Sequence, residues 1–233
     1  MAPFSTATEN RAPTLAPDVL GDRFVSLGSV DYGTDNPQER IEQAHQLLNA
    51  SPDVASSSIA ALATVGDHQA LRAIVDENPQ VVKADCGPNR WPLLLYAAYS
   101  RIEPQRPGWS TLATAKLLLD RGADPNDGQG LYNNQMGGPA NDDPRHLELL
   151  VEFGLGRDRN GPWYRRLGNK LHSPEDLLYN ELAAAAAGRP KRMAFLLSPD
   201  AEPRLDLERL VGRSGLPPVR IAAQGGHHEV LPR

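Results

Sequence analysis

The segment Thr111–Asp127 has the sequence TLATAKLLLDRGADPND. Its apolar residues recur at the spacing of one helix face and so predict a short helix: Leu112, Ala115, Leu118 and Leu119. Ser110 is a suitable N-cap for this helix, because its hydroxyl can accept a hydrogen bond from the first turn. Gly122 follows the last turn, where glycine readily adopts the left-handed conformation that ends a helix. The segment therefore predicts a helix that is closed by a glycine and a turn.

Related segments occur along the rest of the chain. A leucine-rich helix pattern followed by a turn recurs at 71–85, 146–156, 44–54 and, more weakly, 191–198. Asn78 takes the place of the glycine in the first of these, and Gly154 takes it in the second. A different pattern, running through aliphatic residues to a pair of small residues, is found at 59–67, 91–98 and 217–227. Together the two patterns predict a repeated unit of helix, tight turn, helix and loop.

The two patterns resemble the ankyrin repeat. Its first helix has the consensus sequence Thr-Pro-Leu-His-x-Ala-Ala, and its second helix has the consensus Gly-His-x-Glu-Val-Val-x-Leu-Leu-Leu. The match is specific in Thr111–Asp127 and in Pro217–Leu231, good in 59–85 and weaker in between. The resemblance is to a bacterial-type ankyrin repeat protein with degenerate, insertion-bearing repeats. It implies an all-α, ankyrin-type α-solenoid of about five helix-turn-helix repeats.

Domain boundaries follow from the resemblance. Residues 1–17 are predicted to be disordered, and 18–55 to form an N-terminal helical cap with helices over 18–30 and 38–49. Residues 56–233 would hold the repeats. Landmarks of the second helices lie 44, 32 and 46 residues apart (Val75, Leu119, Val151 and Leu197). With a repeat of about 33 residues, these spacings predict insertions of roughly 11 and 13 residues, at 101–109 and within 157–171, and a degraded third repeat at 128–138.

Composition is that of an ordinary soluble protein, with 40% hydrophobic and 23% charged residues and a net charge of −5. From Arg157 onward there are 13 basic and 9 acidic residues without a dense basic block, so nucleic-acid binding is not expected. The single cysteine, Cys86, excludes an internal disulfide and suits a reducing compartment. Neither a signal peptide nor a membrane-spanning run is apparent, and a cytoplasmic monomer is expected.

The tail contains two adjacent histidines and a glutamate, His227-His228-Glu229, which invite a metal-site interpretation. Adjacent residues on a helix point about 100° apart, whereas a two-histidine site needs an i, i+4 spacing. The three residues also match the Gly-His-x-Glu start of an ankyrin second helix. Sequence motifs of metal, phosphate or nucleophile sites are absent, so we predict no catalytic residue, metal or cofactor.

Aromatic and arginine side chains in the insertions are the candidates for partner binding, because Tyr, Trp and Arg dominate protein interfaces. Per-repeat insertions also tend to lie on one face, often the binding face. The candidates are Arg101, Arg106, Trp109, Tyr132, Asn134, Trp163 and Arg165. Three other aromatic residues, Trp91, Tyr96 and Tyr99, are predicted to pack in the core or between repeats.

The function implied by the resemblance is a non-catalytic scaffold that binds another protein through the concave face and loops of the stack. One alternative is a regulatory or immunity-type subunit of an enzyme or a toxin. Another is an uncharacterised enzyme that uses the histidine- and arginine-bearing loops. The last repeat is incomplete, since Pro232-Arg233 interrupts its second helix. It is expected either to be truncated from a longer reading frame or to form a frayed C-terminal cap.

Overall fold

The structure is a computed structural model that describes residues 19–29, 37–126, 142–157, 174–199, 201–209 and 215–228. Every regular element in these ranges is a helix, and they contain no β-strand; two isolated bridges join Ser29 to Ser100 and Cys86 to Trp91. The all-α prediction is therefore confirmed for the described residues. The expected disorder of residues 1–17 and the expected degraded repeat at 128–138 lie outside them.

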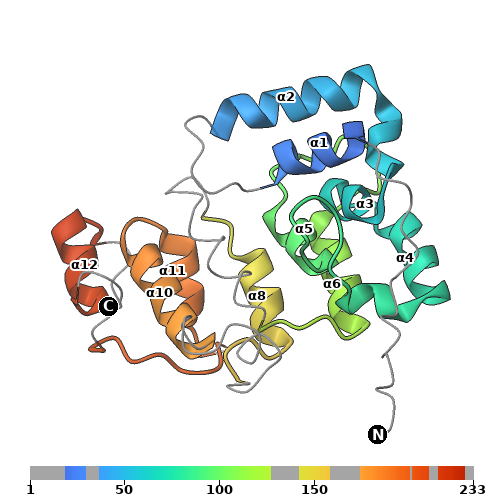
Figure 1. Cartoon of the computed structure of the whole chain (residues 1–233). Coiled ribbons are helices and arrows are strands. Elements are labelled where there is room, and N and C mark those ends of the chain that lie inside the picture. The colour runs from blue at the N-terminus through green and yellow to red at the C-terminus, as the bar shows by residue number, and fades with distance from the viewer. Residues whose placement is uncertain are drawn as a thin grey trace, which may run out of the picture.

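The first two helices are α1 (Val19–Gly28) and α2 (Pro37–Ala50), followed by the 3₁₀ turn η1 (Pro52–Ser56). Both helices were predicted, with ends that differ by two residues or fewer. They pack on each other, and α1 also packs on α3 (Ile59–Val65). The predicted cap segment thus covers α3, as Figure 1 shows at the top of the molecule.

Four helices form a second group next to this cap segment: α3, α4 (His68–Glu77), α5 (Leu93–Tyr99) and α6 (Thr111–Asp120). The 3₁₀ turn η2 (Pro79–Lys83) follows α4. Each helix packs on its sequence neighbour of the same pair, α3 on α4 and α5 on α6. In addition α3 packs on α5 and α4 packs on α6, so that like helices of the two pairs are adjacent.

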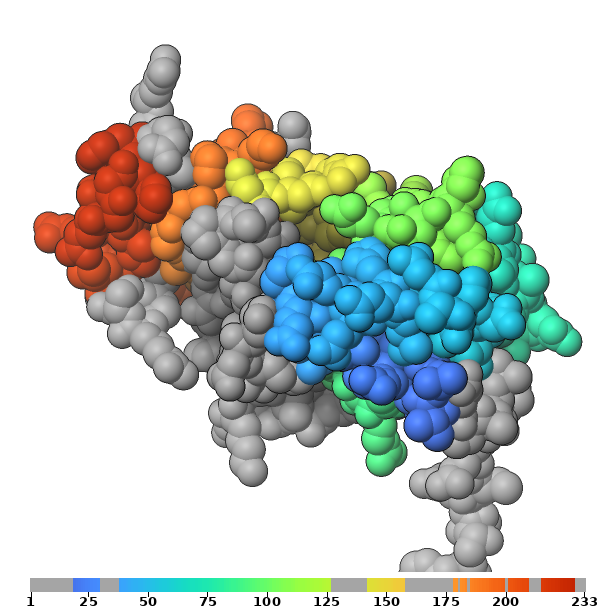
Figure 2. All heavy atoms as spheres, turned by 90° about the horizontal axis from the view of Figure 1, so that it is seen from above, coloured from blue at the N-terminus to red at the C-terminus, as the bar shows by residue number. Residues whose placement is uncertain are grey.

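The C-terminal part contains α8 (Arg145–Glu152), α10 (Pro174–Ala186), α11 (Pro190–Leu196) and α12 (Pro218–Gly225). Helix α8 packs on α6, while α10 packs on both α11 and α12. Figure 2 shows the resulting order along the molecule, from α4 and α6 at one end through α8 to α12 at the other. None of the described helices is long and apolar enough to cross a membrane.

Local sequence signals place the helix ends. The Ser110 hydroxyl accepts a 3.1 Å hydrogen bond from the Ala113 amide, and Ser58 caps α3 in the same way. Gly122 has φ +88°, as predicted for the residue that ends α6. Asn78 ends α4 at the position where glycine stands in the other segments, but with φ −135° rather than in the left-handed conformation. Pro79 begins η2 directly after Asn78 and disfavours a helical conformation there, which leaves the chain extended instead.

Replacing Gly122 by alanine tests the left-handed ending of α6. The nearest atom to an added Cβ is Lys83 Cε at 3.7 Å, at the far end of a flexible side chain, so the cost is conformational rather than steric. We expect Gly122→Ala to lower the free energy of unfolding by about 1 kcal/mol. Urea denaturation measures this change, and an unchanged midpoint would contradict the left-handed assignment.

The three aromatic residues predicted to pack inside do so. Tyr96 and Tyr99 are fully buried on α5. The Trp91 ring lies 5.5 Å from the Tyr96 ring and 5.9 Å from the Tyr99 ring, measured between centroids. The Tyr96 hydroxyl donates to the Cys86 carbonyl at 2.9 Å, so its polar end is satisfied. These contacts tie the turn before α5 to the helix and confirm the packing role.

Candidate functional site

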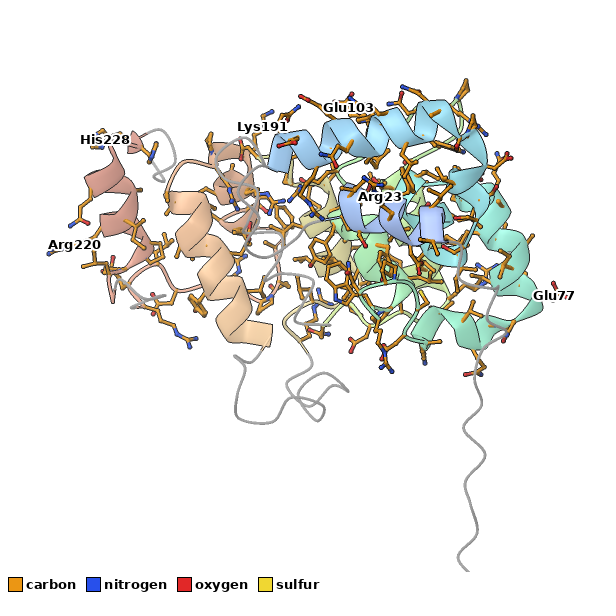
Figure 3. All side chains as sticks on the ribbon, turned by 45° about the horizontal axis from the view of Figure 1, so that its top comes forward. Arg23, Glu77, Glu103, Lys191, Arg220 and His228 are labelled. Atoms are coloured by element: carbon orange, nitrogen blue, oxygen red, sulfur yellow. The ribbon has the colours of Figure 1, made fainter. Side chains whose placement is uncertain are left out.

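Arg101 lines a cleft of about 390 Å³ that lies between the ends of four helices. One side of the cleft is formed by the residues after α5 and by the first turn of α6. The other side is formed by the residues at the start of α8 and of α11. The lining residues are Ala98, Ser100, Arg101, Ile102, Glu103, Pro104, Ser110, Thr111, Leu112, Asp143, Arg145, His146 and Arg192. Figure 3 labels Glu103, which lines the cleft, and Lys191, the sequence neighbour of the lining residue Arg192.

The backbone at Arg101 is held firmly against the body of the protein. The Arg101 amide donates to the Gly28 carbonyl at 2.8 Å, and Ser100 pairs with Ser29 in an isolated bridge. The Ser100 hydroxyl donates to the Thr64 carbonyl at 2.5 Å. Ile102 is 4% exposed and packs in the core. Residues on both sides of Arg101 are therefore anchored, which fixes where its side chain leaves the chain.

The guanidinium of Arg101 lies among other positive charges. Burial lowers the pKa of Arg101 from its ordinary value, and the charges of Arg192 and Arg189 act in the same direction. No carboxylate among the described residues forms an ion pair with Arg101. An arginine remains protonated in such surroundings, so a positive charge is retained in the cleft without an acidic partner.

The neighbouring Arg145 does have an acidic partner. Its Nε lies 2.9 Å from Asp143 Oδ2 and its Nη2 lies 2.5 Å from the same oxygen. The hydrogen bonds from Arg145 hold the pKa of Asp143 at about 2. The Arg145 backbone amide donates to this carboxylate as well. The pair is internally neutralised, and it forms one edge of the cleft.

Arg192 is part of a buried ionic cluster beneath the cleft. Its Nη1 lies 2.5 Å from Glu181 Oε1 on α10, and Arg189 Nη1 lies 3.8 Å from the same oxygen. The side chains of Glu181 and Arg192 are 0% and 1% exposed. At the start of α11, the Asp142 carboxylate accepts hydrogen bonds from the amides of Lys191 and Arg192. These contacts join α11 to α10 and to the segment before α8.

His146 and Thr111 form a pair inside the cleft, with 3.3 Å between His146 Nε2 and Thr111 Oγ1. A hydroxyl beside an imidazole could suggest a nucleophile and its base. Burial lowers the pKa of His146 to about 4, which makes the ring a weak base at neutral pH. The nearby Asp143 carboxylate is engaged by Arg145 rather than by the His146 ring. The arrangement suits a packing contact between α6 and α8.

The titration of His146 predicts a pH-dependent stability. Its folded-state pKa of about 4 lies below the ordinary value of 6.5, so between these values the unfolded chain binds the proton more readily. Stability should therefore fall as the pH falls from about 6.5 to about 4, before Asp143 titrates near pH 2. The Tm values of the wild type and of His146→Gln, measured by thermal melts, should approach each other as the pH falls through this range. Parallel pH profiles would contradict the assignment.

Two of the other predicted partner-binding residues, Arg106 and Trp109, are described by the structure and do not line the cleft. Arg106 is exposed and its guanidinium carbon lies 4.9 Å from the centroid of the Trp109 ring. Trp109 itself is half-buried against the core, next to the N-cap of α6. The remaining four predicted residues, Tyr132, Asn134, Trp163 and Arg165, lie outside the described residues. Among the described candidates, Arg101 is thus the one that the fold brings into the cleft.

Sequence reasoning missed most of the other lining residues. His146 was considered only as a residue at a helix start, and Arg145 and Arg192 were not singled out. None of them belongs to a local motif, and they meet because α6, α8 and α11 begin at the same place. The sequence feature that these three residues share is their position, because each lies within two residues of the start of a predicted helix.

Cys86 and the histidines of the tail lie outside the cleft. Burial, with a smaller contribution from Asp85, raises the pKa of the Cys86 thiol to about 12, so it is protonated at neutral pH. Within the part of the chain that the structure describes, no group of three or more His, Cys, Asp or Glu residues could hold a metal ion. His227 and His228 are included in that part, whereas Glu229 is not.

Comparisons with protein-family models, with curated proteins and with solved structures found no match to this chain.

Proposed function

We propose that this chain is an ankyrin-type stack of helix-turn-helix repeats that binds another protein and catalyses no reaction. The adjacency of like helices supports the stack: α3 lies against α5, and α6 lies against both α4 and α8. Glycines with positive φ at the helix ends suit the same repeat, as at Gly122 and Gly154. In this proposal the chain acts as a cytoplasmic monomer with a protein partner, without nucleic acid or membrane.

The observation that carries the binding role is the cleft at Arg101. It combines a fixed backbone, an arginine without an acidic partner among the described residues, and a rim of exposed chain at 103–108. A preformed surface of this kind loses little conformational entropy when a partner binds. A regulatory or immunity-type subunit is a special case of the proposal, in which the partner is the enzyme or toxin.

Capture followed by titration tests the proposal. The full chain is immobilised and used to capture protein from cells that produce it, and the captured protein is purified and titrated by calorimetry. We expect a saturable complex of defined stoichiometry that is weakened by Arg101→Gln. Arg220→Gln is the matched control, because Arg220 is an exposed arginine on α12 at a distance from the cleft (Figure 3). Equal weakening by both changes, or no saturable complex, would contradict the proposal.

A further inference from the structure

Within the described part of the chain, each arginine that lines the cleft has an acidic partner except Arg101. Arg145 is bonded to Asp143. Arg192 and Arg189 share Glu181, which forms no ion pair with Arg101. Among the described residues, Arg101 forms no ion pair and is half-buried beside other cations. Half-burying a cation beside other cations lowers the free energy of unfolding. A residue with only a structural role is not expected to carry this cost.

We propose that Arg101 binds a single carboxylate of the protein partner inside this cleft. The carboxylate belongs to an aspartate or glutamate side chain or to the C-terminus of the partner. This inference rests on the protein-binding function proposed above. A planar guanidinium can donate two parallel hydrogen bonds to a carboxylate, so the contact provides both charge matching and orientation.

The surroundings favour a carboxylate over a phosphate group. One unmatched positive charge matches one negative charge, whereas a phosphate dianion would bring a second. The Glu103 carboxylate lines the same cleft and would repel that additional charge. The same region already holds a carboxylate, since Asp142 accepts hydrogen bonds from the first amides of α11.

The rest of the cleft suits the chain that carries the carboxylate. The Thr111 hydroxyl and the His146 ring are neutral polar groups within it, because burial keeps the pKa of His146 at about 4. Ala98, Ile102, Pro104 and Leu112 supply apolar surface. The methylene groups of an acidic side chain can therefore pack on this apolar surface while its carboxylate pairs with Arg101.

Selection from a phage-displayed library of random peptides on the immobilised full chain tests this inference. We expect the enriched peptides to share one acidic residue or a free C-terminal carboxylate. Changing that acid to its amide, or amidating the C-terminus, distinguishes the two sources. Either change at the relevant carboxylate should weaken binding about 10- to 100-fold in fluorescence titrations.

Variants of the chain show whether Arg101 is the recognising group. Arg101→Gln should weaken the acidic peptide by the same factor and should bind the amide peptide as well as the wild type does. Arg101→Lys should retain part of the affinity, and Arg220→Gln should retain all of it. Because Arg101→Gln removes repulsion by Arg192 and Arg189, its Tm should be unchanged or higher than that of the wild type.

Other outcomes overturn the inference. Enriched peptides without a common acid, or acidic peptides that bind equally well to Arg101→Gln, would refute carboxylate recognition while leaving protein binding in place. Displacement of the peptide by inorganic phosphate, at concentrations where acetate has no effect, would refute the preference for a carboxylate. If neither peptides nor proteins bind the wild-type chain, both the inference and the proposed function are wrong.

Discussion

Glu181→Ala is expected to lower the free energy of unfolding by about 3–5 kcal/mol, the largest loss of any single change considered for this protein. The Glu181 carboxylate is completely buried and faces the guanidiniums of Arg192 and Arg189. Burial raises the pKa of Glu181, and the two arginines oppose that shift. Without Glu181, two buried positive charges would face each other with no acid between them. Urea denaturation followed by circular dichroism measures the loss.

Two controls make the experiment specific. Asp120→Ala removes a carboxylate from the Lys116–Asp120 pair, which is 3.0 Å long but exposed, with side chains 54% and 44% accessible. That change should cost less than about 1 kcal/mol. The double change Glu181→Leu with Arg192→Met should recover part of the loss, because it also removes the buried positive charge at Arg192. Equal losses for Glu181→Ala and Asp120→Ala would contradict the burial of the cluster.

Gly66→Ala is expected to lower the free energy of unfolding by about 2–4 kcal/mol. Gly66 has φ +81°, which an alanine adopts only at a cost. An added Cβ would also lie 2.5 Å from the Ser110 carbonyl carbon and from the Thr111 amide nitrogen. These are backbone atoms at the start of α6, held by the hydrogen bond from the Ser110 amide to the Gly66 carbonyl at 2.7 Å. They cannot move aside without displacing the helix.

The comparison with Gly122→Ala separates the two contributions to this loss. Gly122 has a similar φ of +88°, but an added Cβ there meets nothing closer than 3.7 Å. The difference between the two variants therefore reports the contact between the turn after α3 and the start of α6. If both variants lose the same free energy, the two pairs of helices are not packed as closely at Gly66 as the structure shows.

Helix positions could be predicted well because their signals are local. Ser110, the leucines of α6 and Gly122 lie within a few residues of one another, and each acts on the backbone next to it. The same is true of α8, which begins at Arg145 and is followed by Gly154 with φ +100°. Asn78 ends α4 at the predicted position, but its backbone conformation differs from that of Gly122 because Pro79 follows it.

The candidate site was predicted only in part. Arg101 was selected because it lies in an insertion and is an arginine, and the structure places it in the cleft. Arg106 and Trp109 were selected for the same reason, yet Trp109 packs against the core instead. The choice among them depends on which residues of the insertion are anchored, and this is decided by contacts with Gly28 and Thr64, far away in the sequence.

The sequence by itself determined the all-α class, the helix ends and the aromatic packing around α5, because caps, glycines and apolar spacing act over one or two turns. Only the tertiary structure decided that Arg101, His146 and Arg192 share one cleft, and that Glu181 pairs with Arg192 while Arg101 forms no ion pair with a described residue. The physical reason is that a charge is matched or unmatched according to distances in space. Those distances are set by how α6, α8, α10 and α11 pack.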